Sequence, residues 1–432
     1  MKTVNYVTDN LFSHRYLSIV LLFAGGFLSA GINNANADDE VFKPHVVITN
    51  QTVGNLDTGP RPHSFANAGA IFTGADVNLG KLMGNDAGTL QFEYTFFPWL
   101  HNTGLQSSTK WQGAAGSAFA GATLHNDIDS TGYLSLFAYN QMLLDDHLQI
   151  TLGRTNAQRY FYISSCGAMI ACNDPLFMYT TGILPYPYGS WGAYSKYKMD
   201  NGLYAHGGVF ESTPQDYANK TNGLQWGLDG SSKATSLFGF GHQETIAQNP
   251  LPHKYELNVF SNSAKQVDSD SGKEHNSKGI LFRFNQTIYN NNPTSKDLDK
   301  AWQVFGAWSW NADEFQPFQQ FIEAGISRIG PFGRPQDSVN LKASYLRLSE
   351  KQAEFQTQQR LDATGIDQNT SRGESRVELN MHWQATNYLA VEPSIQYIFN
   401  PSNFYNPTAK PNKDGAVVGL QIVYNLGGRL GL

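Results

Sequence analysis

The 432-residue sequence is poor in charge and in cysteine, and it has no long apolar run beyond its first 37 residues. Charged residues make up 15% of the chain, well below the roughly 25% typical of soluble proteins. No later window is apolar over the length that a membrane-spanning helix needs, so we expect a mature chain without transmembrane helices. The formal charge of −6 argues against nucleic acid as a partner, because phosphate binding requires basic surface.

The only two cysteines are Cys166 and Cys172, with five residues between them. In an exported protein, such a pair favours a disulfide. A bridge across so short a segment removes little chain entropy, so its expected role is to shape a local loop. A metal site is the weaker alternative, because Asn173 and Asp174 do not complete a recognisable ligand set.

Motifs for catalysis and cofactor binding are also lacking. There is no Gly-x-Ser-x-Gly elbow, the 11 histidines form no His-Glu-x-x-His pattern, and Gly239-Phe240-Gly241 lacks the third glycine of a dinucleotide site. The aspartate-rich residues 127–129 and 268–272 do not complete a calcium-binding EF-hand loop. The sequence therefore predicts no enzyme, no metal site and no cofactor.

The first 37 residues have the pattern of an export signal. Lys2 and Arg15 supply positive charge, an uncharged and largely apolar run of about fifteen residues follows, and Ala35-Asn36-Ala37 offers a small-residue cleavage site. A membrane anchor is the less favoured alternative, since about twenty residues are needed to span a bilayer as a helix.

What the sequence has in abundance is the alternation of apolar and polar side chains. In residues 416–426, Val418, Leu420 and Ile422 lie on one face, and Gln421 and Asn425 lie on the other. A period of two places alternate side chains on opposite faces of a sheet. Similar runs recur from residue 71 onward, and their polar face carries Glu93, Lys196, Lys198, Lys342, Arg376, Glu378 and His382.

So charged a face favours a barrel over a sandwich with a dry core. In a membrane barrel the polar face lines water, the apolar face meets lipid, and closure leaves no unpaired sheet edge. Tight turns such as Asn201-Gly202 alternate with long polar connections such as residues 155–189, which is the outer-membrane pattern. After a polar lead-in at residues 38–68, we expect residues 69–432 to form an all-β, transmembrane antiparallel barrel. Its length suits 16 strands, and its last strand is expected to close on residues 71–79.

The most distinctive motifs lie between residues 333 and 401 and include Gly333-Arg334-Pro335-Gln336-Asp337 and Val391-Glu392-Pro393-Ser394. Together with residues 138–156 and 190–193, they resemble carbohydrate-selective outer-membrane porins of the OprB type. The resemblance implies a 16-stranded barrel in the outer membrane of a Gram-negative bacterium. It also implies passive diffusion of small sugars, with monosaccharides such as glucose first.

In that family an inward-folded loop narrows the pore, and residues 155–187, with their cysteine pair, are the best candidate for it. Arginine offers a fork of donors that suits sugar hydroxyls, and carboxylates accept the hydroxyl protons. We therefore predict a pore constriction formed by Arg154, Arg159, Glu93, Asp174, Lys196 and Lys198. For each of them, a solvated charge in a wide vestibule is an equally weighted alternative. Gly333, Arg334, Pro335 and Asp337 are expected to hold a turn rather than to contact substrate.

Other interpretations stay open at this point. A porin for another small solute, such as an organic acid, would depend more on charge than on aromatic groups. A receptor or adhesin would have a plugged barrel without conductance. The expected partners are small sugars, outer-membrane lipid and lipopolysaccharide, and a homotrimer is one of the open oligomeric states. Residues 350–361 are expected to form an extracellular loop with a helical turn or two.

Overall fold

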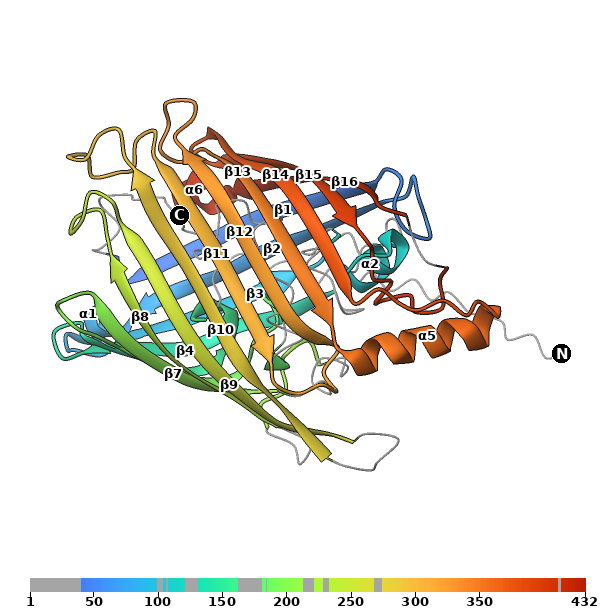
Figure 1. Cartoon of the computed structure of the whole chain (residues 1–432). Helices are drawn as coiled ribbons and strands as arrows, with labels where there is room; N and C mark the ends of the chain where they lie inside the picture. Colours follow the sequence, from blue (N-terminus) through green and yellow to red (C-terminus); the bar gives the residue numbers. More distant parts are fainter. Residues whose placement is uncertain are drawn as a thin grey trace, which may run out of the picture.

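The computed structural model describes residues 40–98, 104–105, 108–120, 131–161, 181–183, 185–212, 221–227, 233–267, 274–410 and 413–432. Within them, sixteen strands form one closed antiparallel barrel (Figure 1). Each strand pairs with its neighbours in the sequence, and the first strand pairs with the last. The predicted all-β barrel of 16 strands is confirmed.

The strands are β1 (Phe42–Asn55), β2 (Phe65–Asn78), β3 (Thr89–Phe96), β4 (Gly132–Leu143), β5 (Leu148–Thr155), β6 (Ser190–Lys198), β7 (Leu203–Glu211), β8 (Ala234–Glu244), β9 (His253–Val267), β10 (Glu274–Tyr289), β11 (Trp302–Asn311), β12 (Phe318–Ile329), β13 (Ser338–Leu348), β14 (Gly373–Thr386), β15 (Leu389–Phe399) and β16 (Gly415–Asn425). The helical segments are α1 (Leu79–Met83), α2 (Ser108–Ala115), η3 (Ala157–Arg159), α5 (Glu350–Thr364) and α6 (Leu426–Leu430). None of the helices in the described ranges has the length and apolar character needed to cross a membrane.

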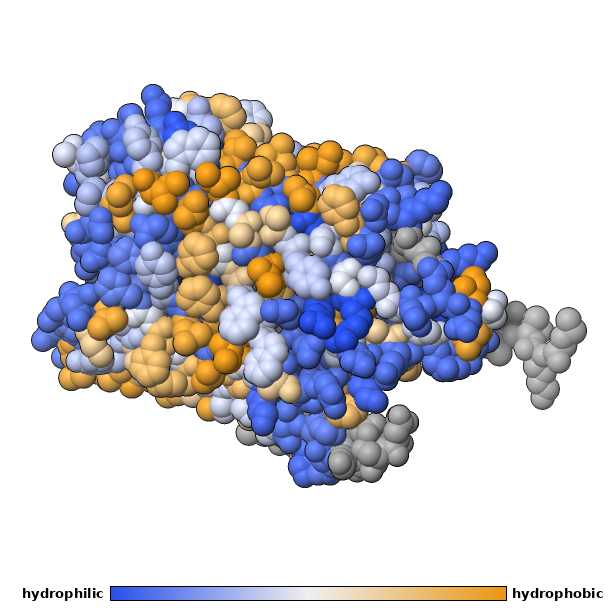
Figure 2. Space-filling model, viewed as in Figure 1, coloured by the Kyte–Doolittle hydropathy of each residue, from blue (hydrophilic) through white to orange (hydrophobic). Residues whose placement is uncertain are grey.

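The two faces of the wall differ as the alternation predicts. On β14, Val377, Leu379 and Trp383 are exposed on the outside, whereas Arg376 and Glu378 are buried on the inside. Figure 2 shows apolar side chains gathered along the wall and hydrophilic ones toward its two ends. An apolar outside around a polar lumen is the pattern of a transmembrane barrel.

The barrel begins earlier than the sequence predicted. Residues 42–55, assigned to a polar lead-in, form β1, which pairs with both β2 and β16. The last strand therefore closes on β1 and not on residues 71–79. The alternation of β1 is weak because its outward face carries polar Asn50 and Thr52 as well as Ile48, so the two faces differ little in polarity.

Two helices modify the ends of the barrel. α5 runs for 15 residues, longer than the helical turn or two expected. Ser349 caps its first turn by accepting a hydrogen bond from Gln352 N, and Gly365 ends it in the left-handed region with φ 70°. At the other end of the barrel α6 follows β16 and lies against the start of β1. The proposed export signal at residues 1–37 lies outside the described residues.

Candidate functional site

In the part of the chain that the structure describes, two long connections enter the barrel, although only one was predicted to do so. The β3–β4 connection carries α2, whose Trp111 is fully buried against the inward side chains Val53, Ala68 and Val417. Large aromatic groups that lose all contact with water bind strongly by the hydrophobic effect. Trp111 therefore anchors α2 on the inner wall, beside the seam between β1 and β16.

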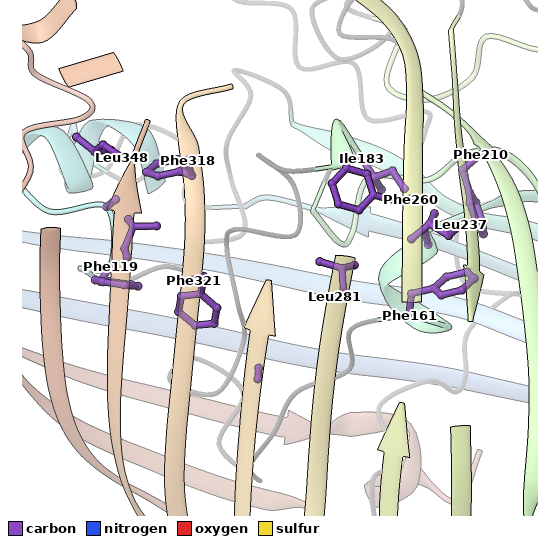
Figure 3. Packing of buried hydrophobic residues seen from close by; sticks show 14 of the residues in the cluster. Phe119, Phe161, Ile183, Phe210, Leu237, Phe260, Leu281, Phe318, Phe321 and Leu348 are labelled. Carbon is purple, nitrogen blue, oxygen red and sulfur yellow. The ribbon is translucent and has the colours of Figure 1, made fainter. Parts of the chain in front are cut away.

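The two connections share one apolar cluster inside the barrel (Figure 3). Phe119, from the β3–β4 connection, packs with its ring centroid 6.1 Å from that of Phe321 on β12. Phe161, from the β5–β6 connection, lies 6.2 Å from Phe210 on β7, edge to face. Both connections thus fill part of the lumen. The β5–β6 connection is the predicted constriction loop, and its described ends lie inside the barrel.

Glu93 and Arg159, both predicted at the constriction, are brought together. Glu93 on β3 is fully buried, accepts a hydrogen bond from the Tyr186 hydroxyl and lies 3.1 Å from His45 Nε2. Arg159, at the end of η3, interacts electrostatically with Glu93, His45 and Asp76. Because Tyr186 covers it, Glu93 acts as an anchor for the loop, while Arg159 and Asp76 keep partly exposed side chains.

A second group of charges, which includes the predicted Lys196, lines β6, β9 and β10. Glu256 is buried at its centre, with Lys254 Nζ at 3.4 Å and Arg283 Nη2 at 3.3 Å from its carboxylate. Lys196 Nζ stands 3.8 Å above the ring of Tyr204, whose hydroxyl donates to Glu256 at 2.5 Å. Three basic side chains against one carboxylate give this wall an excess of basic groups.

A third group of charged side chains lies on β12, β13 and β14. Its basic and acidic members pair with one another and largely neutralise their charges. Lys342 Nζ is 3.0 Å from Glu323 and 3.9 Å from Glu378, and Arg376 Nη1 is 3.4 Å from Glu378. The Arg376 guanidinium also stacks on Phe119 at 4.7 Å. These buried pairs therefore hold the β3–β4 connection against the wall and leave little charge for a solute.

The remaining predicted constriction residues lie elsewhere. Arg154 is almost fully buried and donates to the carbonyl oxygens of Gly189 at 2.8 Å and Gln225 at 2.9 Å. These bonds hold two connections, so the expected contact with solute is not supported. Lys198 is exposed at the tight-turn end of β6. Asp174, Cys166 and Cys172 lie outside the described residues.

The Gly333–Asp337 motif lies in the turn between β12 and β13. Gly333 has φ +81°, Arg334 Nε donates to Asp337 Oδ2 at 2.8 Å, and Asp337 N donates to Arg334 O at 3.1 Å. These contacts join residues within the turn.

Several functional residues were not singled out from the sequence. His45 belongs to the strand that was assigned to a lead-in, and Tyr186 belongs to a connection without periodicity. Glu256 and Lys254 alternate with apolar residues in the sequence, but only the three-dimensional closure brings Arg283 and Tyr204 to them. The run of small apolar residues at 114–120, unusual in an exposed loop, was the one signal that could have revealed the second inward connection.

A closed sixteen-stranded barrel with an apolar outside and a polar lumen narrowed by inward loops defines a porin of the outer membrane. The chain matches the carbohydrate-selective porin family OprB over residues 62–426, and it belongs to that family. It is 23% identical over 415 residues to a protein of Acinetobacter baylyi named as the porin QuiX, covering 88% of each chain.

Among solved structures, the fold is similar to that of OprB from Pseudomonas putida. The high-pH structure of that protein matches with a TM-score of 0.73 at 18% identity, covering 90% of this chain and 96% of the other. The low-pH structure matches with a TM-score of 0.53 at 15% identity, covering 90% and 94%. At these identities the likeness concerns the fold.

Proposed function

We propose that this porin lets small neutral sugars, monosaccharides such as glucose first, diffuse passively past η3. The observation that carries the proposal is the position of Arg159 and Tyr160. Arg159 faces the acidic wall of Asp76 and Glu93, and Tyr160 stacks on Tyr194 at 4.1 Å beside the basic wall. Both side chains are partly exposed.

This arrangement suits an uncharged polyol. A guanidinium offers five donors in a fixed fork, a carboxylate accepts hydroxyl protons, and an aromatic ring supplies an apolar face. A solute held by several such weak contacts can also leave, which conduction requires. The proposal assigns the recognition of hydroxyl groups to Arg159 and Asp76.

Planar-bilayer recording of the purified protein tests the proposal. Glucose should lower the ion conductance in a dose-dependent manner, and Arg159→Gln should weaken that block. Arg347→Gln is the matched control, because Arg347 is exposed on the outer face of β13. A channel indifferent to glucose and maltose would refute the sugar assignment. A protein without conductance would favour a plugged receptor or adhesin instead.

A second candidate, a porin for small organic acids, is favoured by the excess of positive charge around Glu256. Lys196, Lys254 and Arg283 could attract a carboxylate within the lumen. In the same recordings, block by simple carboxylates with indifference to sugars would support this alternative. The variant Lys254→Met should then weaken the block by carboxylates and leave any effect of sugars unchanged.

We also propose, as parts of the same function, that residues 1–37 are removed on export and that Cys166 and Cys172 form a disulfide in the constriction loop. Intact mass and thiol counting of the mature protein test both. The apolar wall should contact lipid and lipopolysaccharide, and cross-linking in membranes tests for a homotrimer. The chain should act as a channel and not as an enzyme, so lipid-hydrolysis assays should stay at background.

A further inference from the structure

The turn between β12 and β13 borders a shallow open depression on the outside of the barrel. Phe332, Arg334, Met381 and Trp383 line it, and its volume is about 580 Å³. Met381 and Trp383 share the outward face of β14 with exposed Leu379, so the depression faces away from the lumen. It therefore lies outside the proposed path of the sugar and requires a different ligand.

Within the described residues, the guanidinium of Arg334 is held in place by a hydrogen bond at its Nε atom only. Its Nε donates to Asp337 Oδ2 at 2.8 Å, and Asp337, fully buried, accepts at Oδ1 from Gln384 N at 2.9 Å. The arginine side chain is 41% exposed, and its two terminal nitrogens make no hydrogen bond to the residues that the structure describes. A fork of donors fixed at its base and open at its tip is suited to a phosphate or carboxylate group.

Above Arg334, the outer wall turns apolar. Trp383, Met381 and Leu379 follow one another in that order along the outward face of β14, away from the turn, and Phe332 is exposed on the turn itself. A cation at the rim and an apolar column toward the middle of the wall match the order of groups in a phospholipid. The phosphate would lie at the rim, and an acyl chain would lie along the column.

The same rim carries two more arginines against aromatic rings. Arg328 lies over Trp302 at 5.0 Å, and Arg429 lies over Tyr388 at 5.9 Å. The short turns of such barrels face the periplasm, so these residues are at the level of lipid headgroups. The rim thus offers positive charge together with aromatic groups where an anionic headgroup lies.

We propose that the depression formed by Phe332, Arg334, Met381 and Trp383 binds one phospholipid of the periplasmic leaflet, with the phosphate on Arg334. Asp337 is a positioning residue that orients the guanidinium. The commitment to a lipid rests on charge complementarity at Arg334 and on the apolar column above it. The site is independent of the solute that the lumen conducts.

Native mass spectrometry of the full-length protein in detergent tests the proposal. The protein is titrated with dioleoylphosphatidylglycerol and, separately, with dioleoylglycerol, which lacks the phosphate. We expect the wild type to retain one phosphatidylglycerol, and Arg334→Gln to bind it about tenfold more weakly through the loss of a charge-assisted contact. The glutamine can still donate to Asp337, which preserves the turn.

Arg347→Gln is the matched control, because it removes an exposed arginine from the other end of the outer wall, and it should leave the affinity unchanged. Heat-modifiable migration and ion conductance verify that each variant is folded. If Arg334→Gln does not fold, Phe332→Ser keeps the Arg334–Asp337 pair and should still weaken binding severalfold.

Equal affinity of the wild type and Arg334→Gln would overturn the proposal, as would an equal loss in Arg347→Gln. Dioleoylglycerol binding as tightly as phosphatidylglycerol would show that the phosphate is not recognised. A dimer of the wild type that Arg334→Gln abolishes would assign the depression to a second copy of the chain and would likewise refute the lipid site.

Discussion

Tyr186 ties the returning end of the β5–β6 connection to the inner wall, and removing its hydroxyl should release that end. The hydroxyl donates to Glu93, which is fully buried on β3, and the ring stacks on Phe72 at 5.7 Å. Tyr186→Phe keeps the ring and its stacking, so the substitution isolates the hydrogen bond. The remaining hydrogen-bond partner of Glu93 within the described contacts is His45.

The expected size of the effect follows from the burial of Glu93. Leaving a buried acceptor without its donor costs about 1–3 kcal/mol, and more when the acceptor is charged. Tyr186 is only partly buried, so water can reach Glu93 once the loop lifts, and we expect a value of about 1–2 kcal/mol. Such a change lowers the ratio of docked to undocked loop by about 5- to 30-fold. The strand pairings do not involve this bond, so the barrel should keep its resistance to heat.

Single-channel recording is the appropriate assay. Tyr186→Phe should show more frequent transitions to a higher conductance than the wild type. Tyr397→Phe, which alters an exposed tyrosine on the outer face of β15, should behave like the wild type. Identical recordings of Tyr186→Phe and the wild type would refute the assignment of Glu93 as a loop anchor. A parallel loss of heat-modifiable migration would show instead that Tyr186 supports the barrel itself.

Three further predictions concern other parts of the chain. Trp111→Ala should destabilise the packing of α2 by about 3–5 kcal/mol, and limited proteolysis should then cleave the β3–β4 connection faster; an unchanged rate would show that Trp111 is not the anchor. The hydrogen bond to Asp200 raises the pKa of His147, so Asp200→Asn should lower that pKa. In the wild type, the pair stabilises the fold below the ordinary histidine pKa, and this stabilisation fades as pH rises through the raised pKa. NMR titration of His147 measures this, and an unchanged midpoint would contradict it. Glu256→Gln removes the one carboxylate among the basic side chains around it and should shift the zero-current potential in a salt gradient toward chloride selectivity. An unchanged potential would place the cluster off the ion path.

The orientation of the strands could be predicted because lipid imposes a simple pattern on the outer face. On β16, Leu420 and Ile422 are exposed outside, whereas Val417 and Gln421 are buried inside, as the alternation indicates. The inner face follows no such rule, because it packs against the two inward connections. That is why β1, with a partly polar outer face and an apolar Val53 beneath Trp111, could not be recognised as a strand.

Glycine residues also obscure the alternating pattern of β8 in the sequence. On β8, Gly239 lies on the inner face, where an added Cβ would approach Asn258 Oδ1 to 1.8 Å and His206 Nε2 to 2.7 Å. The small residue is required by side chains on the neighbouring strands β7 and β9, which no local pattern reveals. In sequence, Gly239-Phe240-Gly241 only interrupts the alternation. His45 and Tyr186, the partners of Glu93, were missed for a similar reason, since they meet Glu93 only after the barrel closes.

The pairing of β1 with β16 has a consequence for how the barrel assembles. Gln51 bonds to Gln421 across the seam, 370 residues away along the chain, so the seam forms only when both ends of the chain are present. Pairings so distant in sequence are slow to form, because the entropy of closing the loop is lost before any contact compensates for it. Until then, β1 and β16 each present an open edge that another chain could extend. Closing the seam between the first and the last strand is therefore the step of assembly at which the barrel is most exposed to aggregation.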